Sequence, residues 1–207
     1  MMKSLSKSIT ARYYHVEPAD AMAFTVKKIG QGILEGSKYM PIRNFAAGLV
    51  APAPRKDYLS QLKLLWNGFL KRWRYVKDPR HTELLTAGPA AMYRLTMGFA
   101  GGLDGKGHGG GDCDCAAMAF GALASSIGFE VRICTTAKPF LPMSHVFVQC
   151  HVPKLGWITT DPVLLPKMGF GDIPKFGRLE AYNLFGKLLF RINRQRQGAF
   201  YPRVVKR

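Results

Sequence analysis

The sequence predicts an α+β fold, and three observations lead to that prediction. Apolar residues recur at three- and four-residue spacing over residues 57–77 and again over 112–126, which is the period of a helix. After residue 129 apolar and polar residues alternate instead, which is typical of strands with one buried face. Hydrophobic residues make up 47% of the chain, enough for a globular core. The expected core is a buried helix packed on an antiparallel sheet, preceded by a mainly helical region.

That N-terminal region contains two predicted helices before residue 57. Residues 1–20 carry Ser, Lys, Thr and Arg and are expected to form an arm with little regular structure. Residues 21–34 predict a helix that ends at Gly30 and Gly32, because glycine weakens helices. Residues 39–50 predict a second helix, which the prolines that follow it terminate.

The clearest predicted helix begins after Asp57, which is expected to be its N-cap. Its apolar residues form one continuous stripe: Leu59, Leu62, Trp66, Phe69, Trp73 and Val76. Asp78-Pro79 is expected to end it, since the residue before a proline avoids helical geometry. Residues 87–111 predict a long glycine-rich connection with one helical turn.

The stretch from Gly109 to Ala119 is the most distinctive in the chain. A glycine run leads into Cys113 and then into a small-residue apolar segment, which predicts a buried helix reaching about residue 126. Asp112 is expected to be the N-cap, so Cys113 would lie in the first turn, where the helix dipole favours a thiolate. Cys113 is therefore the candidate nucleophile. Asp112 and Asp114 oppose thiolate formation, so a cation is required nearby.

Three strands are predicted after this helix, over residues 129–134, 144–150 and 156–160. The last two form a hairpin. If that hairpin is centred on Pro153, His145 and Asp161 lie directly opposite each other on one face. The sequence thus predicts Cys113 at a helix start and a His145–Asp161 pair on adjacent strands.

A Cys-His-Asp set has a defined chemistry. The thiolate attacks an amide carbonyl to form a thioester, the histidine takes and returns the proton, and the carboxylate orients the imidazole. The backbone N–H of Cys113 would supply half of an oxyanion hole. The other cysteines, Cys115, Cys134 and Cys150, are expected to be buried structural residues.

A zinc site formed by Cys113, Cys115, His108 and His145 is an alternative interpretation. The spacing of these ligands matches no common zinc module. We therefore expect neither a metal nor a cofactor.

The cysteine pattern and the N-terminus bear on the compartment. Cys113 and Cys115 are awkwardly placed for a disulfide, which favours thiols in a reducing compartment. Residues 1–23 lack the hydrophobic core of a signal peptide, and no apolar run approaches the length of a membrane span. We expect a cytoplasmic location.

The net charge of +17 lies mostly outside the central part of the chain. Net charge is +6 over residues 1–56, +3 over 57–166 and +8 over 167–207. Basic flanks of this kind indicate an anionic neighbour, such as DNA, an acidic protein or a membrane surface. A solvated surface that keeps the protein soluble explains the same charges equally well.

Three segments, taken in order, resemble one family. They are Gly-Asp-Cys-Asp (111–114) at a helix start, Ser-His-Val-Phe-Val (144–148) on a strand, and Gly-Trp-Ile-Thr-Thr-Asp-Pro (156–162). This order resembles the transglutaminase-like superfamily of cysteine proteases, and it looks closest to the small members encoded by bacteriophages and prophages. The segment over residues 73–79 also resembles the stretch that those proteins carry before the glycine loop.

The resemblance implies a papain-like core with Cys113 as nucleophile, His145 as base and Asp161 as the acid that orients it. It implies a peptide or protein amide as substrate. Relatives usually show a second acidic residue where this chain has Cys115.

The resemblance also divides the chain. Residues 38–166 would form the catalytic domain, between a basic N-terminal arm and helix (1–37) and a basic C-terminal extension (167–207). Leu184, Leu188 and Ile192 fall at helical spacing in that extension and predict a helix, which either packs on the domain or docks on an anionic assembly.

Two functions follow as hypotheses. The first is a phage-encoded cysteine peptidase, amidase or acyl transferase that acts in the cytoplasm of the host through a thioester. The second is a virion structural or binding protein, in which the fold is a scaffold and the basic flanks contact DNA or neighbouring subunits.

Overall fold

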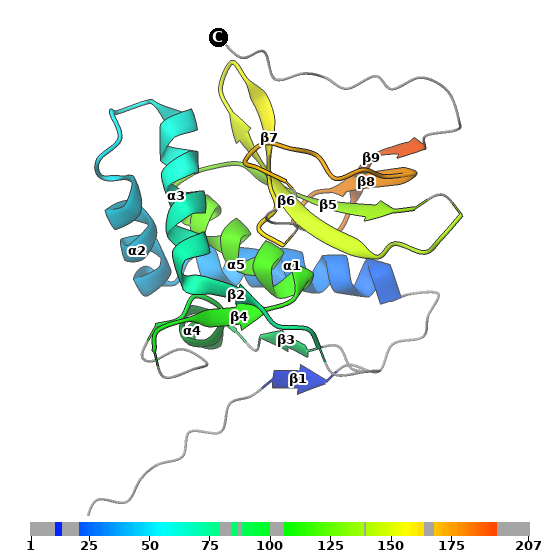
Figure 1. The fold of residues 1–207 in the computed structure, drawn as a ribbon, viewed down its shortest axis with the longest axis horizontal. Coiled ribbons are helices and arrows are strands. Elements are labelled where there is room, and N and C mark those ends of the chain that lie inside the picture. Colours follow the sequence, from blue (N-terminus) through cyan, green and yellow to red (C-terminus); the bar gives the residue numbers. More distant parts are fainter. Residues whose placement is uncertain are drawn as a thin grey trace, which may run out of the picture.

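The computed structural model describes residues 11–13, 21–78, 84–86, 88–99, 106–138, 140–163 and 168–193. These residues form an α+β fold with N-terminal helices and an antiparallel sheet, as predicted (Figure 1). The helical segments are α1 (Ala21–Ser37), α2 (Met40–Val50), α3 (Tyr58–Arg72), α4 (Pro89–Ala91), the π-helical η1 (Met92–Thr96) and α5 (Cys113–Ser126). The strands are β1 (Ala11–Tyr13), β2 (Trp73–Tyr75), β3 (Leu84–Thr86), β4 (Gly109–Gly111), β5 (Val131–Ala137), β6 (His145–Val152), β7 (Gly156–Thr160), β8 (Arg178–Tyr182) and β9 (Leu188–Asn193).

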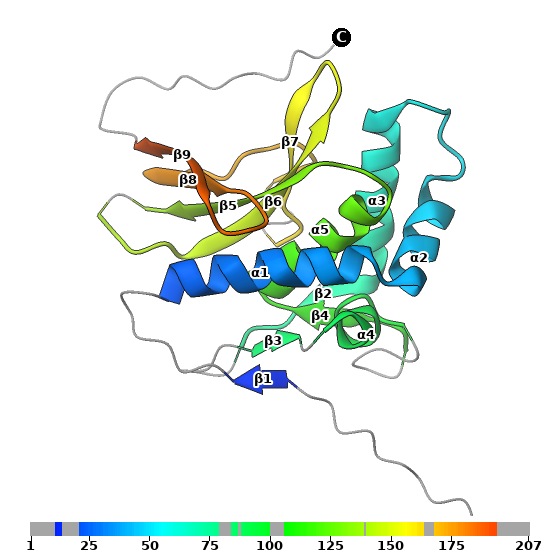
Figure 2. The same cartoon turned by 180° about the vertical axis from the view of Figure 1, so that it is seen from behind.

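Helices α1 and α5 pack against each other beside the sheet (Figure 2). Gly30 and Gly32, where we expected the first helix to end, lie inside α1. A Cβ atom at Gly32 would lie 2.0 Å from the Met118 sulfur, and one at Gly30 would lie 2.1 Å from the Leu184 carbonyl oxygen. These glycines therefore permit close approach of neighbouring segments, and the predicted helix end was wrong.

Helix α3 begins where the sequence predicts and ends early. The Asp57 carboxylate accepts a hydrogen bond from the Ser60 N–H at 3.1 Å, as an N-cap does. Beyond Arg72 the chain becomes extended and forms β2, which pairs in parallel with the glycine strand β4. Trp73 remains buried, and its ring stacks on Phe69 with centroids 6.0 Å apart. The apolar stripe therefore continues across a change of structure that spacing alone does not reveal.

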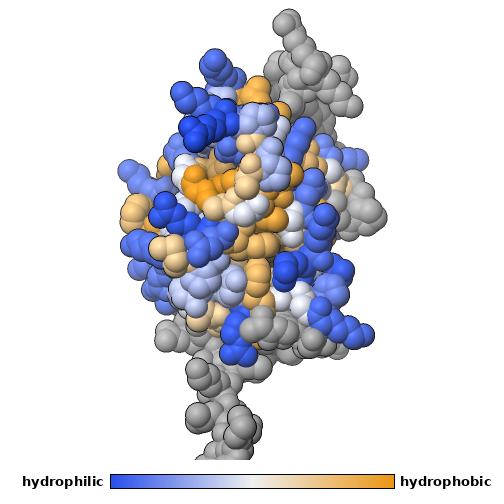
Figure 3. Space-filling view, turned by 90° about the vertical axis from the view of Figure 1, so that its left-hand side faces the viewer, coloured by the Kyte–Doolittle hydropathy of each residue, from blue (hydrophilic) through white to orange (hydrophobic). Residues whose placement is uncertain are grey.

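Figure 3 views the side of the molecule on which α2 and α3 lie. Apolar surface gathers at the centre of this side, and hydrophilic residues surround it. Several partly buried residues of the two helices pack against the core beneath: Phe45, Leu49, Val50, Leu59 and Leu70.

The sheet has the strand order β7-β6-β5-β8-β9, and every pairing in it is antiparallel. Alternate residues of β6, namely Val146, Val148 and Cys150, join the main core cluster with α5. Phe147 belongs to a separate small cluster with Leu179 of β8. The sheet thus has one face toward the helices and another face with its own, smaller core.

The C-terminal segment differs from the prediction. Residues 178–193 form the hairpin of β8 and β9, whereas the spacing of Leu184, Leu188 and Ile192 predicts a helix. The Asn183 carboxamide oxygen accepts hydrogen bonds from the backbone N–H groups of Phe185 and Lys187, at 3.0 and 2.9 Å, which closes a turn. The boundary drawn at residue 166 therefore falls between two strands of one sheet, and the segment beyond it is not a helical extension.

The N-terminal arm contributes β1, which pairs antiparallel with β3. Residues 1–10 and 14–20 of the predicted arm lie outside the described residues. In the described parts of the chain, no helix combines the length and apolar character needed to cross a membrane.

Candidate functional site

Cys113 is the first residue of α5, where the sequence places it, and its side chain is partly buried against the main core. Gly111, two residues before it, has φ of +152°, which disfavours any side chain. A Cβ atom there would also lie 2.4 Å from the Cys115 Cβ. The glycine strand therefore lets the chain approach α5 closely and enter its first turn.

Asp112 occupies the N-cap position with an extended backbone, but its side chain makes no capping hydrogen bond. Its carbonyl oxygen accepts from the Ala116 N–H at 3.0 Å, which begins the helix. The predicted N-cap is thus correct in position and wrong in the role of the carboxylate. The carboxylate that bonds within the first turn is that of Asp114, which accepts from the Cys115 N–H.

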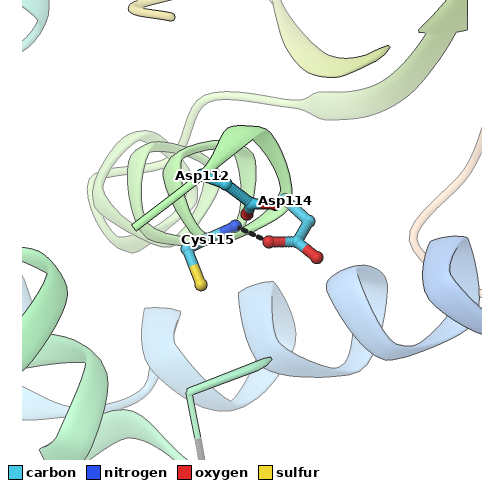
Figure 4. Close-up of side chains that lie close together, drawn as sticks. All are labelled: Asp112, Asp114 and Cys115. Carbon is cyan, nitrogen blue, oxygen red and sulfur yellow. Dashed lines mark hydrogen bonds between the residues drawn. The ribbon is translucent and has the colours of Figure 1, made fainter. Parts of the chain in front are cut away.

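Asp112, Asp114 and Cys115 bring one ligand atom each within 4.8 Å of one another (Figure 4). Asp114 also accepts a hydrogen bond from the Cys115 N–H at 2.5 Å. A tetrahedral zinc site takes four ligands, whereas this cluster offers three, and neither His108 nor His145 of the zinc alternative is among them. We assign no metal to this cluster.

The structure brings His145 and Asp161 together. The Nε2 atom of His145 lies 2.6 Å from Oδ2 of Asp161, and the two side chains are 14% and 2% exposed. The other carboxylate oxygen, Oδ1, accepts from the Val163 N–H at 3.0 Å. Both oxygens of Asp161 are thus held, so the carboxylate has a fixed direction toward the imidazole.

The register of the hairpin is shifted by two residues from the predicted one. Val148 pairs with Thr160 and Val152 with Gly156, so the hairpin is centred on Lys154 and not on Pro153. His145 and Asp161 are consequently diagonal neighbours and not directly opposite, which still allows side-chain contact on one face. The two-residue shift preserves that face, because side chains alternate with a period of two.

Cys113 is the first residue of α5 and His145 is the first residue of β6, and these two elements run in the same direction. The short connection after α5 reverses the chain into β5, and β5 pairs antiparallel with β6 (Figure 1). A Cβ atom at Gly121 would lie 3.5 Å from Cγ1 of Val148, which locates the crossing of helix and strand. Cys113 precedes that crossing by roughly 12 Å along the helix. His145 precedes it by roughly 10 Å along the strand, so both residues lie toward the same end.

The imidazole does not lie on the face that α5 covers. His145 stacks on Phe147 with ring centroids 5.9 Å apart, and Phe147 belongs to the opposite face. The last β6–β7 pair involves Val148, so β7 has ended before it reaches the level of His145. Cys113 and the imidazole therefore lie toward the same end of the sheet, with the imidazole on the face that α5 does not cover.

The remaining cysteines are buried, as predicted. Cys115 is 4% exposed, and Cys134 and Cys150 are fully buried. Burial raises the pKa of both the Cys134 and the Cys150 thiol to about 12. All four cysteines lie in the described part of the chain, and no disulfide joins them.

Tyr75 lies beside the start of α5, and the sequence analysis did not single it out. It pairs with Gly111 across β2 and β4, and its side chain is 52% exposed. Burial first, and then the negative charges of Asp112 and Cys113, raise the pKa of its hydroxyl. The phenol thus stays protonated at neutral pH and is a hydrogen-bond donor in the electrostatic neighbourhood of Cys113. Its signal in the sequence is its place in the segment that resembles the family upstream of the glycine loop.

No known protein-family model matches this chain, and no curated protein matches its sequence. Among solved structures the chain is similar to a candidate protease from Parabacteroides distasonis, with a TM-score of 0.47 and 10% identity, over 81% of this chain and 30% of that one. It is also similar to Rad4–Rad23 bound to a 6-4 photoproduct UV lesion, with a TM-score of 0.42 and 15% identity, over 78% and 45%. The chain spans less than half the length of either protein. At these TM-scores neither similarity bears on function.

Proposed function

We propose that this protein is a thiol enzyme that cleaves or transfers amide bonds, with Cys113 as nucleophile, His145 as base and Asp161 as the orienting acid. The observation that carries the proposal is the buried pair of His145 and Asp161, 2.6 Å apart. Helix α5 begins with Cys113 and strand β6 begins with His145. Because the two elements run in the same direction, both residues lie toward the same end, which supports Cys113 as the third residue of the triad. The fold and function that the family resemblance implies agree with this assignment.

The pair defines which imidazole nitrogen would act as the base. With Nε2–H donating to Asp161, Nδ1 of His145 is left as the proton acceptor for the Cys113 thiol. The thiolate then attacks the amide carbonyl carbon, and the oxyanion receives hydrogen bonds from the Cys113 N–H and from the Tyr75 hydroxyl.

Collapse of this intermediate breaks the C–N bond, and the imidazolium returns its proton to the leaving amine. The acyl group stays on sulfur as a thioester. Water completes hydrolysis and an amine completes transfer, so one set of residues serves both outcomes.

The test is a thiol-directed probe read by mass spectrometry. Iodoacetamide at neutral pH should label Cys113 first in the wild type and much more slowly in His145→Ala. A panel of peptide, protein side-chain and peptidoglycan amides, with Cys113→Ser as control, then identifies the substrate. Preferential labelling of Cys115, or labelling of Cys113 that does not depend on His145, would overturn the assignment.

A binding or virion-structural role remains a second candidate because of the edge strand β9. Its residues Leu188, Leu189 and Ile192 are 41–48% exposed, an unusual share for apolar side chains, and Lys187 directly precedes the strand while Arg191 lies within it. In this role the basic surface would bind an anionic partner such as DNA. Titration with duplex DNA at rising salt tests it, since phosphate contacts give a steep loss of affinity with salt. Salt-sensitive binding in a protein without Cys113 reactivity would favour this role over the enzyme.

A further inference from the structure

A buried acid lies beside Cys113. Asp114 is 1% exposed and occupies the second position of α5, next to Cys113. An ionised carboxylate in such a place is costly unless positive charge approaches it. The helix N-terminus provides part of that charge, since it carries about half of a positive elementary charge.

Helix α1 is the neighbour that Asp114 faces. In Figure 4 the carboxylate of Asp114 is directed from α5 toward α1. The contacts of two glycines set the register between these helices: a Cβ atom at Gly32 would meet Met118, and one at Gly36 would meet Ala122. The residue numbers of the contacting positions increase in the same direction along α1 and α5, so the two helices run parallel. One turn earlier in each helix, the same register places Lys28 opposite Asp114.

Lys28 has the burial and the reach for this place. Its side chain is partly buried, in contrast with its exposed neighbour Lys27. Its ammonium lies 5.5 Å from the centroid of the Phe24 ring, so the aliphatic stem follows the helix surface and does not extend into solvent. A lysine stem can carry the ammonium from the edge of α1 to a facing carboxylate.

The geometry points to an ion pair between Lys28 and Asp114 across the α1–α5 interface, which offsets the negative charge beside Cys113 and makes Lys28 a positioning residue for the thiolate. The role of Lys28 in catalysis rests on the proposed function, whereas the ion pair between Lys28 and Asp114 does not. Tyr75 of β2 pairs with Gly111 just before α5, and the charges that act on it are those of Asp112, Cys113, Asp114 and Asp78, none of which is positive. The Arg74 side chain of the same strand is exposed and donates to the carbonyl oxygens of Leu70 and Trp73. His145 of β6 can carry positive charge, and Asp161 already binds it.

The experiment measures the rate of Cys113 alkylation by iodoacetamide as a function of pH. Lys28→Met should shift the midpoint of the profile to higher pH and slow alkylation at neutral pH about tenfold, because the charge of Asp114 is then unopposed. Asp114→Asn should shift the midpoint the other way. The double variant should return to within a factor of about two of the wild type. Lys27→Met is the matched control, one residue away on α1, and should leave the profile unchanged.

A second readout keeps the pair testable apart from catalysis. Urea unfolding of the wild type, Lys28→Met, Asp114→Asn and the double variant forms a double-mutant cycle, in which each single variant should be destabilised and the double variant should recover part of the loss. If wild-type Cys113 proves unreactive, the proposed function fails and this cycle still decides the pair. Additive destabilisation, or a Lys28→Met profile equal to that of the wild type, would overturn the inference. If Lys28→Met does not fold, Lys28→Arg replaces it and should keep the wild-type pH profile of alkylation. An unchanged profile in Asp114→Asn would also overturn the inference.

Discussion

The two faces of β6 differ in what they offer. Val146, Val148 and Cys150 point toward α5 and are buried in the main core. His145 and Gln149 alternate with them on the other face, and each binds a partner on or next to β7. The first face packs against α5, the helix that begins with Cys113, while the second face carries the imidazole of His145. The strand thereby separates the main core from the hydrogen bonds of its own polar side chains.

The polar face itself contains two arrangements. Gln149 accepts two hydrogen bonds from Arg132, at 2.8 and 2.6 Å, and donates one to Thr159 at 3.0 Å. The Arg132 guanidinium also lies 4.2 Å from the Trp157 ring centroid. This network satisfies its own members, which is typical of a structural role. The His145–Asp161 pair leaves one imidazole nitrogen for a proton from elsewhere, which is typical of a catalytic one.

The largest expected effect separates the thiols. Cys134 and Cys150 lie on opposite faces of the sheet, and burial raises the pKa of both to about 12. Their thiolate fraction at neutral pH is therefore lower by roughly 10³-fold than that of an ordinary cysteine. Iodoacetamide should label Cys113 in the native protein and reach these two only after unfolding, as peptide mapping can show. Native labelling of Cys150 at a comparable rate would mean that the helix-covered face is open.

The next effect concerns the polar face alone. Asp161→Asn should keep the fold while lowering turnover roughly 10²- to 10⁴-fold, because the amide favours the wrong imidazole tautomer. The kinetic comparison uses whichever amide the substrate panel identifies, and circular dichroism reports the fold. Gln149→Glu, two strand positions beyond Phe147 on the same face, is the control for a general disturbance. An Asp161→Asn enzyme with wild-type turnover would remove the pair from the mechanism.

A smaller effect is expected from the structural network. Gln149→Leu deprives the half-buried Arg132 guanidinium of its acceptor and should lower the free energy of unfolding by ~1–3 kcal/mol. Denaturant titration measures this change. Cys113 alkylation should keep its wild-type rate in the folded variant, since the network does not include His145. Slower Cys113 alkylation in the folded Gln149→Leu variant would show that the Gln149 network and the His145–Asp161 pair are coupled.

The smallest effect lies at the β8–β9 end. Burial first, and then the Glu180 carboxylate that accepts its hydrogen bond, raise the pKa of Tyr182 to about 12. A tyrosine pKa raised in the folded state stabilises the protein below its unfolded value near 10, and this contribution is lost as pH rises through about 12. Thermal unfolding should therefore show a shallow alkaline loss that Tyr182→Phe removes. An unchanged slope in that variant would assign the loss to other groups.

The alternation of apolar and polar residues was enough to predict the shared face of His145 and Asp161, because parity survives an even shift of register. It was not enough to predict the register, which depends on the turn. Lys154 and Gly156 both adopt positive φ, of 69° and 82°, and this pairs Val152 with Gly156. Only glycine signals such a conformation in the sequence.

The C-terminal hairpin shows why spacing alone misleads. Leu184 and Leu188 match a helical period, yet Asn183 and Gly186 carry the turn chemistry that decides the structure. The start of α5 was predictable because three features of the sequence, a glycine run, an acidic residue and a small-residue segment, all indicate a helix that begins at Cys113. The parallel pairing of β2 with β4 was not, since it joins segments more than thirty residues apart.

That glycine strand also limits how the site can vary. A Cβ atom at Gly109 would lie 2.1 Å from the Thr96 carbonyl oxygen, and one at Gly111 would lie 2.4 Å from the Cys115 Cβ. Both obstacles belong to main chain or to a buried side chain close to it, so neither can rotate away. In a library randomised over β4, selection for folding alone would therefore return glycine at these two positions. Intolerance to mutation there would reflect the room that the approach to Cys113 requires and would not by itself identify residues that touch a substrate.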